Sequence, residues 1–141
     1  MIQRIQTIWL LLAGIAGFLT TQIPLYTGTL VGEVVKKYYA TENLLLFAVS
    51  IIGALLALIA IFLFRNRSTQ MRFTVLGMVV SIAMIALEVW QIGSFQQSGG
   101  ILRGSYYWGA LLPIAMVIFF ILAAVNIRKD NKLVKSLDRL R

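Results

Sequence analysis

The chain contains no cysteine and no histidine among its 141 residues. Without cysteine, the protein has no disulfide, no thiolate nucleophile, no iron–sulfur cluster and no acylated cysteine. Without histidine, neither a histidine-assisted serine nucleophile nor a histidine metal site can be built. We therefore expect no metal ion and no other cofactor.

Acidic residues are scarce as well, since five Asp and Glu face thirteen Lys and Arg and leave a net charge of +8. The two aspartates, Asp130 and Asp138, both lie near the C-terminus, so no pair of aspartates can act together inside the apolar part of the chain. The glycines follow no phosphate-binding spacing. These absences favour a protein that is not an enzyme.

Long apolar runs dominate what is present. Hydrophobic residues make up 60% of the chain and charged residues 13%, whereas an average soluble domain has about 25% charged residues. About 20 apolar residues in a helix match the hydrocarbon core of a bilayer. The four predicted spans cover residues 5–25, 44–64, 73–92 and 106–127. We therefore predict an all-α fold, an integral membrane four-helix bundle that forms one domain over residues 1–141.

Local signals suggest where these helices begin and end. Asn43 is predicted to cap the second helix, and Gly93 is predicted to end the third. Ser105 is predicted to cap the fourth helix, and Pro113 to kink it, because proline removes an intrahelical hydrogen bond.

The basic residues are distributed unequally between the two sides of the predicted spans. Ten lie on one side, namely Arg4, Arg65, Arg67, Arg72, Arg128, Lys129, Lys132, Lys135, Arg139 and Arg141. Three lie on the other side, namely Lys36, Lys37 and Arg103. The positive-inside rule then places both termini in the cytoplasm. Such a basic surface is expected to meet anionic lipid headgroups rather than nucleic acid.

The outer connections carry further signals. Apolar residues in the first follow helical spacing opposite charged ones, at Val31, Val34, Val35, Tyr38 and Tyr39. This spacing predicts a short amphipathic helix on the membrane, with a strand over residues 27–31 as the alternative. The second, residues 93–104, is predicted to be an irregular turn. The aromatic residues Tyr106, Tyr107 and Trp108 are expected to anchor the chain at the outer interface.

The last residues, 128–141, form a basic tail with helical periodicity. Its apolar face carries Leu133, Val134, Leu137 and Leu140, and its flanking cations are Lys132, Lys135, Arg139 and Arg141. This pattern predicts a short amphipathic cytoplasmic helix. We expect it to contact anionic lipids or a membrane-protein partner. Within the spans, small residues four apart, such as Gly53 and Ala57, are expected to pack helices of the same chain together. The alternative is that one such face forms a homodimer.

Glu88 is the one formally charged residue in the four predicted spans. It shares a helical face with Gly77, Ser81, Met84 and Gln91, which predicts that it points into the bundle. Counting from Arg72 places it about 24 Å across the membrane, near the outer boundary, where Arg103 is the expected partner. Two interpretations stay open: a structural, paired carboxyl, and a proton- or cation-linked site.

Both ends of the chain resemble a known family. The opening residues 1–13, MIQRIQTIWLLLA, and the closing residues 132–141, KLVKSLDRLR, are similar to the ends of a family of small four-helix inner-membrane proteins of Bacteroidota, described as a domain of unknown function. The resemblance implies a four-span protein of the bacterial inner membrane with a basic tail. It implies no activity, ligand or catalytic residue.

Two functions are compatible with these features. The first is a non-catalytic subunit or scaffold of a membrane complex, which the absence of catalytic residues favours. The second is a small transporter, or a subunit of one, in which Glu88 is the proton- or cation-linked site.

Overall fold

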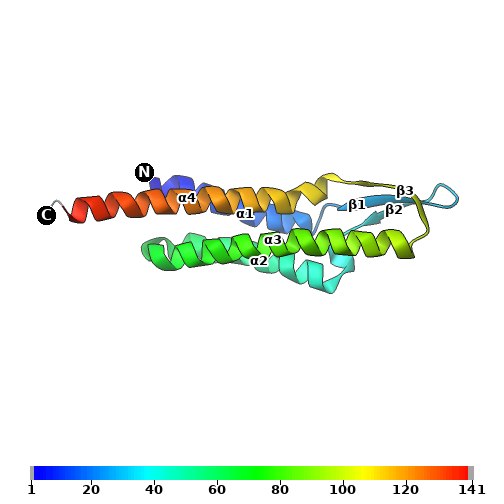
Figure 1. Ribbon diagram of the computed structural model, residues 1–141, viewed down its shortest axis with the longest axis horizontal. Coiled ribbons are helices and arrows are strands. Elements are labelled where there is room, and N and C mark those ends of the chain that lie inside the picture. Colours follow the sequence, from blue (N-terminus) through cyan, green and yellow to red (C-terminus); the bar gives the residue numbers. More distant parts are fainter. Residues whose placement is uncertain (1, 140–141) are drawn as a thin grey trace.

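The computed structural model describes residues 2–139, with side chains from Ile5 onward. Three parts of the predictions lie outside it: the side chain of Arg4, and residues Leu140 and Arg141. The helices are α1 (Ile2–Thr20), α2 (Leu44–Phe62), α3 (Arg67–Ser98) and α4 (Leu112–Asp138), and the strands are β1 (Tyr26–Leu30), β2 (Val35–Tyr38) and β3 (Ile101–Tyr106) (Figure 1). Three short 3₁₀ helices, Ala40–Glu42, Leu63–Arg65 and Trp108–Leu111, join them.

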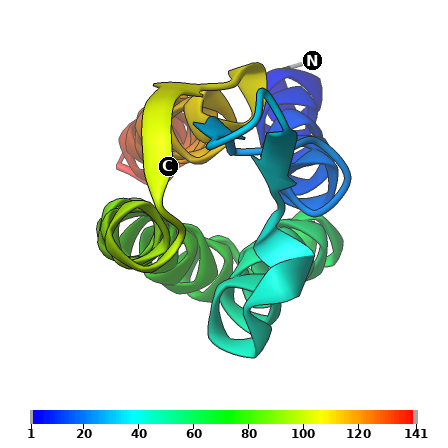
Figure 2. The ribbon, with the colours of Figure 1, turned by 90° about the vertical axis from the view of Figure 1, so that its right-hand side faces the viewer.

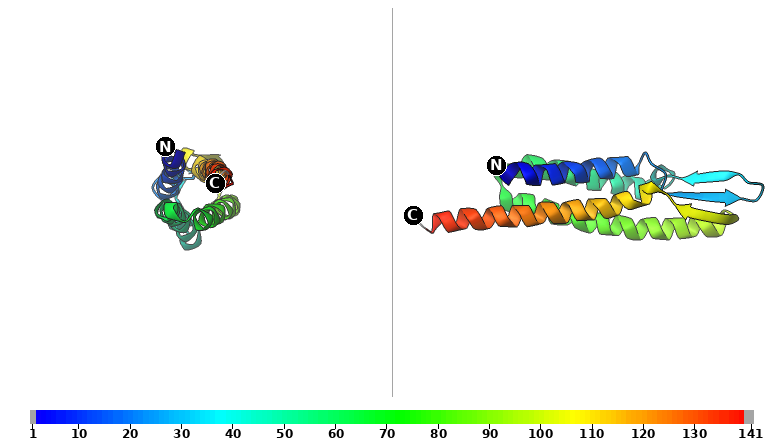
Figure 3. Two further views of the ribbon diagram at one scale, coloured as in Figure 1. Left: turned by 90° about the vertical axis from the view of Figure 1, so that its left-hand side faces the viewer. Right: turned by 90° about the horizontal axis from the view of Figure 1, so that it is seen from above.

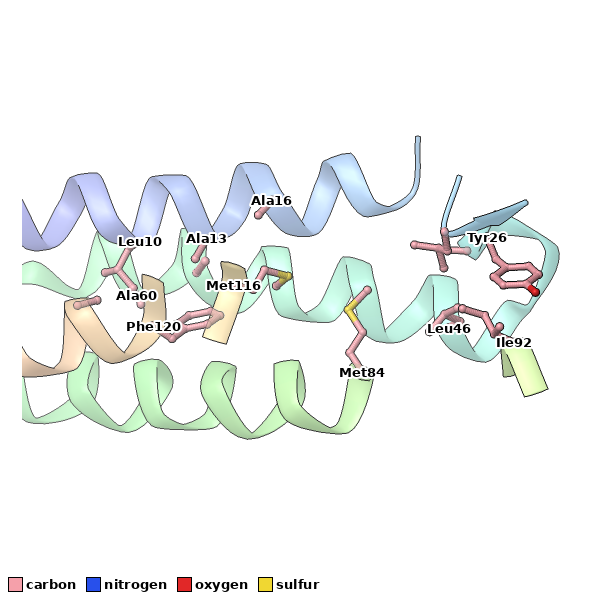
Figure 4. Packing of buried hydrophobic residues seen from close by; sticks show 14 of the residues in the cluster. Leu10, Ala13, Ala16, Tyr26, Leu46, Ala60, Met84, Ile92, Met116 and Phe120 are labelled. Carbon is pink, nitrogen blue, oxygen red and sulfur yellow. The ribbon is translucent and has the colours of Figure 1, made fainter. Parts of the chain in front are cut away.

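The four helices lie side by side around a common axis (Figure 2). Helices α1 and α3 each pack against both α2 and α4. Their apolar residues line the interior, where Leu10, Met84, Met116 and Phe120 are fully buried (Figure 4). Small residues let the backbones approach, as at Gly17, which packs against Ala54. Close packing of this kind holds helices together in lipid.

Three helical segments in the described part of the chain are long and apolar enough to cross a membrane. They are Leu44–Arg65, Arg67–Ser98 and Trp108–Asp138. The apolar helix Ile5–Thr20 is shorter and rises about 24 Å. The sequence therefore predicted the four apolar helices, and three of them are long enough to cross a membrane. Several predicted bounds are wrong, because α1 ends at Thr20 and not at residue 25, α3 runs from Arg67 to Ser98, and α4 starts at Leu112 and continues to Asp138.

Asn43 caps α2 as predicted, because its side chain accepts hydrogen bonds from the backbone N–H groups of Leu45 at 3.0 Å and Leu46 at 3.2 Å. Gly93 does not end α3, which continues to Ser98. A single glycine inside a helix costs only about 1 kcal/mol. The turn away from α3 comes later, at Gly100, whose φ is +58°.

The predicted start of α4 is wrong. Ser105 lies in β3, and α4 begins at Leu112, so that Pro113 falls in its first turn. The first N–H groups of a helix have no intrahelical partner, and proline is therefore accepted there without a kink.

The first outer connection is a β-hairpin and not an amphipathic helix. Strand β1 pairs antiparallel with β2 on one side and with β3 on the other. The turn uses positive φ angles at Gly32 (+97°) and Glu33 (+60°), which no helix accommodates. Valine is also common in strands, and the alternative prediction of a strand over residues 27–31 agrees with β1. The second connection, predicted to be an irregular turn, contains β3. The fold is mostly helical with a small sheet, not all-α.

The sheet is fastened to the last turns of α3, beyond the other helices (Figure 3). The Gln96 side chain donates a hydrogen bond to the Tyr26 hydroxyl at 3.0 Å. The Phe95 ring lies 4.9 Å from the Tyr38 ring and 6.3 Å from the Tyr26 ring. Burial raises the pKa of the Tyr38 hydroxyl, and the charge of Glu42 raises it further. We call this end of the molecule the sheet end.

At the opposite end, which we call the terminal end, α1 begins and α4 ends (Figure 1). The predicted amphipathic tail is not a separate helix, because α4 continues without interruption to Asp138. Its last turns project beyond the other helices (Figure 1). We call residues 131–139 the α4 arm.

Candidate functional site

Glu88 lies inside the bundle near the sheet end. Its neighbours one turn away on α3, Met84 and Ile92, are fully buried and point into the core (Figure 4). Glu88 itself is 4% exposed, and Ser81 on the same face is fully buried. Gln91 is half-buried. The helical periodicity therefore placed this face correctly, with Gln91 at its edge.

The expected ion pair between Glu88 and Arg103 is absent from the described residues. Arg103 lies in β3, exposed, opposite Thr29 of β1. Within residues 5–139, the one ion pair closer than 4.0 Å joins other side chains. The Glu88 Oε1 atom is fully buried and has no hydrogen-bond partner in the described part of the chain. The pairing was predicted from proximity at the membrane boundary, but strand β3 carries Arg103 away to the sheet.

A cavity of about 430 Å³ lies beside Glu88, between α3 and the start of α4. Helix α3 contributes Ile85, Glu88 and Val89 to its wall. The facing wall consists of residues from the end of β3 to the first turn of α4, namely Tyr106, Tyr107, Trp108, Ala110, Leu111 and Ile114. Most of this lining is apolar or aromatic, and Glu88 contributes the one carboxyl group in it.

The role of the aromatic residues Tyr106, Tyr107 and Trp108 was interpreted from sequence as interfacial anchoring alone. The structure also makes them part of the cavity wall. A signal for this was present, because these residues and Glu88 were both assigned to the outer boundary of the membrane. The sequence did not show that the chain, after β3, lies next to α3.

A second group of polar side chains is buried towards the terminal end. Gln6 of α1 and Gln70 of α3 are almost fully buried, and their side-chain oxygens have no hydrogen-bond partner among the described residues. Near them, Arg67 Nη2 lies 3.3 Å from Asp130 Oδ2. The sequence places both Arg67 and Asp130 outside the predicted spans, and nothing in it indicated that they pair. Asp130 is buried because α4 remains helical past the predicted end of its span.

The predicted lipid and partner contacts Lys132, Lys135 and Arg139 are all exposed on the α4 arm. Leu133, Val134 and Leu137 are exposed beside them. Arg141 lies outside the described residues. In the part of the chain that the structure describes, no three acidic side chains gather closely enough to hold a metal ion.

The comparisons with known proteins identify a family. A sequence profile described as "Domain of unknown function (DUF4293)" matches residues 2–140, which confirms the resemblance to a family of unknown function. No curated protein and no solved structure matches the chain. With a match over nearly its whole length, the chain belongs to the DUF4293 family.

Proposed function

We propose that this protein is a non-catalytic, four-span protein of the bacterial inner membrane, and that it acts as a subunit or scaffold of a membrane complex. The α4 arm binds the partner and the adjacent anionic lipids. Both termini lie in the cytoplasm, and the sheet end faces the opposite side.

Exposed apolar side chains on all four helices support the membrane location. Examples are Phe18 of α1, Ile52 of α2, Val79 of α3 and Ile118 of α4, each about half exposed. A water-soluble protein rarely leaves so much apolar surface open. Lipid would cover it, and α1, although short, can be accommodated by local thinning of the bilayer.

The α4 arm is the observation that carries the partner-binding role. It leaves the bundle as a continuous helix with exposed Leu133 and Leu137. The cations Lys132, Lys135 and Arg139 lie among them. A helix with an apolar stripe and flanking cations can dock in a partner's groove and pair with anionic lipid headgroups at the same time.

Removal of residues 131–141 tests this role, since it leaves Asp130 and the bundle core in place. The full chain and the truncated chain are isolated from the native membrane in nanodiscs, and the co-purifying proteins are quantified by mass spectrometry. We expect a stoichiometric partner to be lost on truncation. Unchanged recovery of the partner would contradict a role for the arm, and a full chain recovered alone would contradict the subunit function.

Two sets of substitutions separate the arm's apolar contacts from its charges. Leu133→Ser with Leu137→Ser should release the protein partner, while Lys132→Gln, Lys135→Gln and Arg139→Gln should reduce binding to anionic vesicles. If the charge variant alone releases the partner at low salt, the contact is electrostatic rather than a helix docked by its apolar face.

A second candidate function is a small transporter, or a subunit of one, that uses Glu88. The buried, unpartnered Oε1 atom beside a cavity favours it, because ionisable groups inside membranes are costly and are usually kept for ion or proton pathways. Cation or proton flux into liposomes should then fall strongly with Glu88→Gln. Flux that is indifferent to this substitution would rule out the transporter.

A further inference from the structure

We propose that the cavity beside Glu88 binds a lipophilic cation, namely an amine or quaternary ammonium group attached to an apolar tail. The proposal concerns binding alone and requires neither transport nor a protein partner. Its test is therefore independent of the test of the proposed function.

The carboxyl group of Glu88 is the first reason. Glu88 is 4% exposed, and its Oε1 atom has no hydrogen-bond partner in the described part of the chain. Burial of a carboxyl group without a partner is unfavourable. Arg103, the partner that the sequence predicts for Glu88, lies in strand β3 opposite Thr29. Within residues 5–139 it forms no ion pair with Glu88. A cationic group that enters the cavity would supply the missing partner.

The shape and lining of the cavity are the second reason. Its volume of about 430 Å³ falls in the usual range for small-molecule sites, about 300–1,000 Å³. Ile85, Leu111 and Ile114 offer an apolar surface for a tail. Tyr106 and Trp108 lie in the same wall, and aromatic faces attract cations. A carboxyl group, aromatic rings and aliphatic side chains together suit a cation with an apolar body.

The route of entry is the third reason. Several wall residues are also exposed on the outside of the molecule, including Val89 at 57%, Trp108 at 75% and Leu111 at 54%. The cavity therefore opens on the outer surface of the protein, between α3 and α4, and not into the core. In a membrane that surface meets lipid, so the ligand arrives from the bilayer. An ammonium group can donate a hydrogen bond to Oε1 and also neutralise the ionised form of Glu88, whereas an anionic amphiphile would be repelled by that form and a neutral one offers a hydrogen bond without charge compensation.

Binding is measured by calorimetric titration of the purified full chain in a maltoside detergent, which has no amine and no charge. The probes are 4-phenylbutylamine and its neutral counterpart 4-phenylbutanol. We expect saturable binding of the amine that is at least tenfold tighter than binding of the alcohol. Glu88→Gln should abolish this preference and leave the weak binding of the alcohol unchanged.

The matched control is Glu33→Gln, which makes the same change at an exposed position in the hairpin turn, away from the cavity lining. It should bind like the unaltered chain. Thermal midpoints and elution volumes establish that each variant is folded. Equal affinity of the unaltered chain for amine and alcohol would overturn the proposal, and so would an unchanged amine preference in folded Glu88→Gln. If Glu88→Gln does not fold, Ala110→Phe replaces it, because this variant narrows the cavity and keeps the carboxyl group. It must weaken the binding of both probes, and unchanged binding would overturn the proposal.

The source of the cation is settled by native mass spectrometry of protein extracted from its own membrane. An aminolipid bound to the unaltered chain and lost in Glu88→Gln identifies a membrane lipid as the ligand. Binding of the added amine without a bound aminolipid identifies a foreign lipophilic amine. Both results support the same cation site.

Discussion

The ring of Phe120 in α4 occupies the space that a side chain at Gly77 of α3 would need. A Cβ atom built on Gly77 would collide with the ring's Cζ and Cε1 atoms, and Phe120 is fully buried. The close approach of α3 and α4 at this point therefore depends on glycine. Residues of the same two helices also line part of the cavity beside Glu88.

We expect Gly77→Ala to destabilise the protein by about 1–3 kcal/mol, the usual cost of overpacking a core. Unfolding in mixed detergent micelles, followed by circular dichroism, measures the effect. Gly93→Ala is the matched control, since a Cβ at this position of the same helix meets nothing within 4 Å. It should be neutral or stabilising by about 0.5–1 kcal/mol. Equal destabilisation by both variants would contradict the packing described for Phe120.

The ion pair between Arg67 and Asp130 predicts a second stability effect. Asp130→Asn should lower the free energy of unfolding by on the order of 1–2 kcal/mol, because it leaves the half-buried Arg67 guanidinium without its charged partner. Asp138→Asn, an exposed position in the last turn of α4, removes the same charge and should have almost no effect. Similar losses in the two variants would show that overall charge, and not the pair, is responsible.

The contact between Gln96 and Tyr26 predicts a local effect on the sheet. Tyr26→Phe removes the hydroxyl that accepts the Gln96 hydrogen bond, which should weaken attachment of the sheet to α3 by about 1 kcal/mol. Amide hydrogen exchange in β1 should then accelerate several-fold. Tyr106→Phe is the control, because its ring also packs on Tyr26 but its hydroxyl is not part of that bond. If both variants exchange alike, the hydrogen bond does not hold the sheet.

The parts of the structure that depend on local signals could be predicted from the sequence. The helix cap at Asn43 and the inward face that carries Ser81 and Glu88 follow from short-range rules, because cap chemistry and helical periodicity involve neighbours only. The sheet depends on the pairing of Tyr26 with Tyr106, which lie far apart in the chain. Periodicity contains no information on such pairing, so the sequence did not predict β3. The hairpin itself is local, with Tyr26 opposite Tyr38, but its apolar residues also fit helical spacing, which favoured the wrong element.

The candidate site shows the same division. The burial of Glu88 was predictable, since a charged residue on the inward face of an apolar helix is expected to avoid lipid. Its cavity was not, because the facing wall comes from the segment after β3, whose path is set by the sheet. The Arg67–Asp130 pair was missed for a related reason: its burial depends on how far α4 stays helical beyond its apolar run.

The topology can be tested directly because the chain has no cysteine, so that any single cysteine introduced is the one reactive thiol. Val34→Cys lies at the exposed hairpin tip and Ser136→Cys on the exposed α4 arm. With a membrane-impermeant maleimide, we expect Val34→Cys to be labelled in intact spheroplasts and Ser136→Cys only after lysis. The reverse result would invert the proposed orientation.

A third variant, Gln3→Cys, decides whether the short helix α1 also crosses the membrane. Four spans place residue 3 on the same side as the α4 arm, so that it should be labelled only after lysis. Three spans would leave it on the side of the hairpin, and labelling in intact spheroplasts would then show that α1 lies within one leaflet or at the surface. Since Trp9 stacks on Phe119 at 6.0 Å and α1 packs along α4, we expect α1 to cross together with α4.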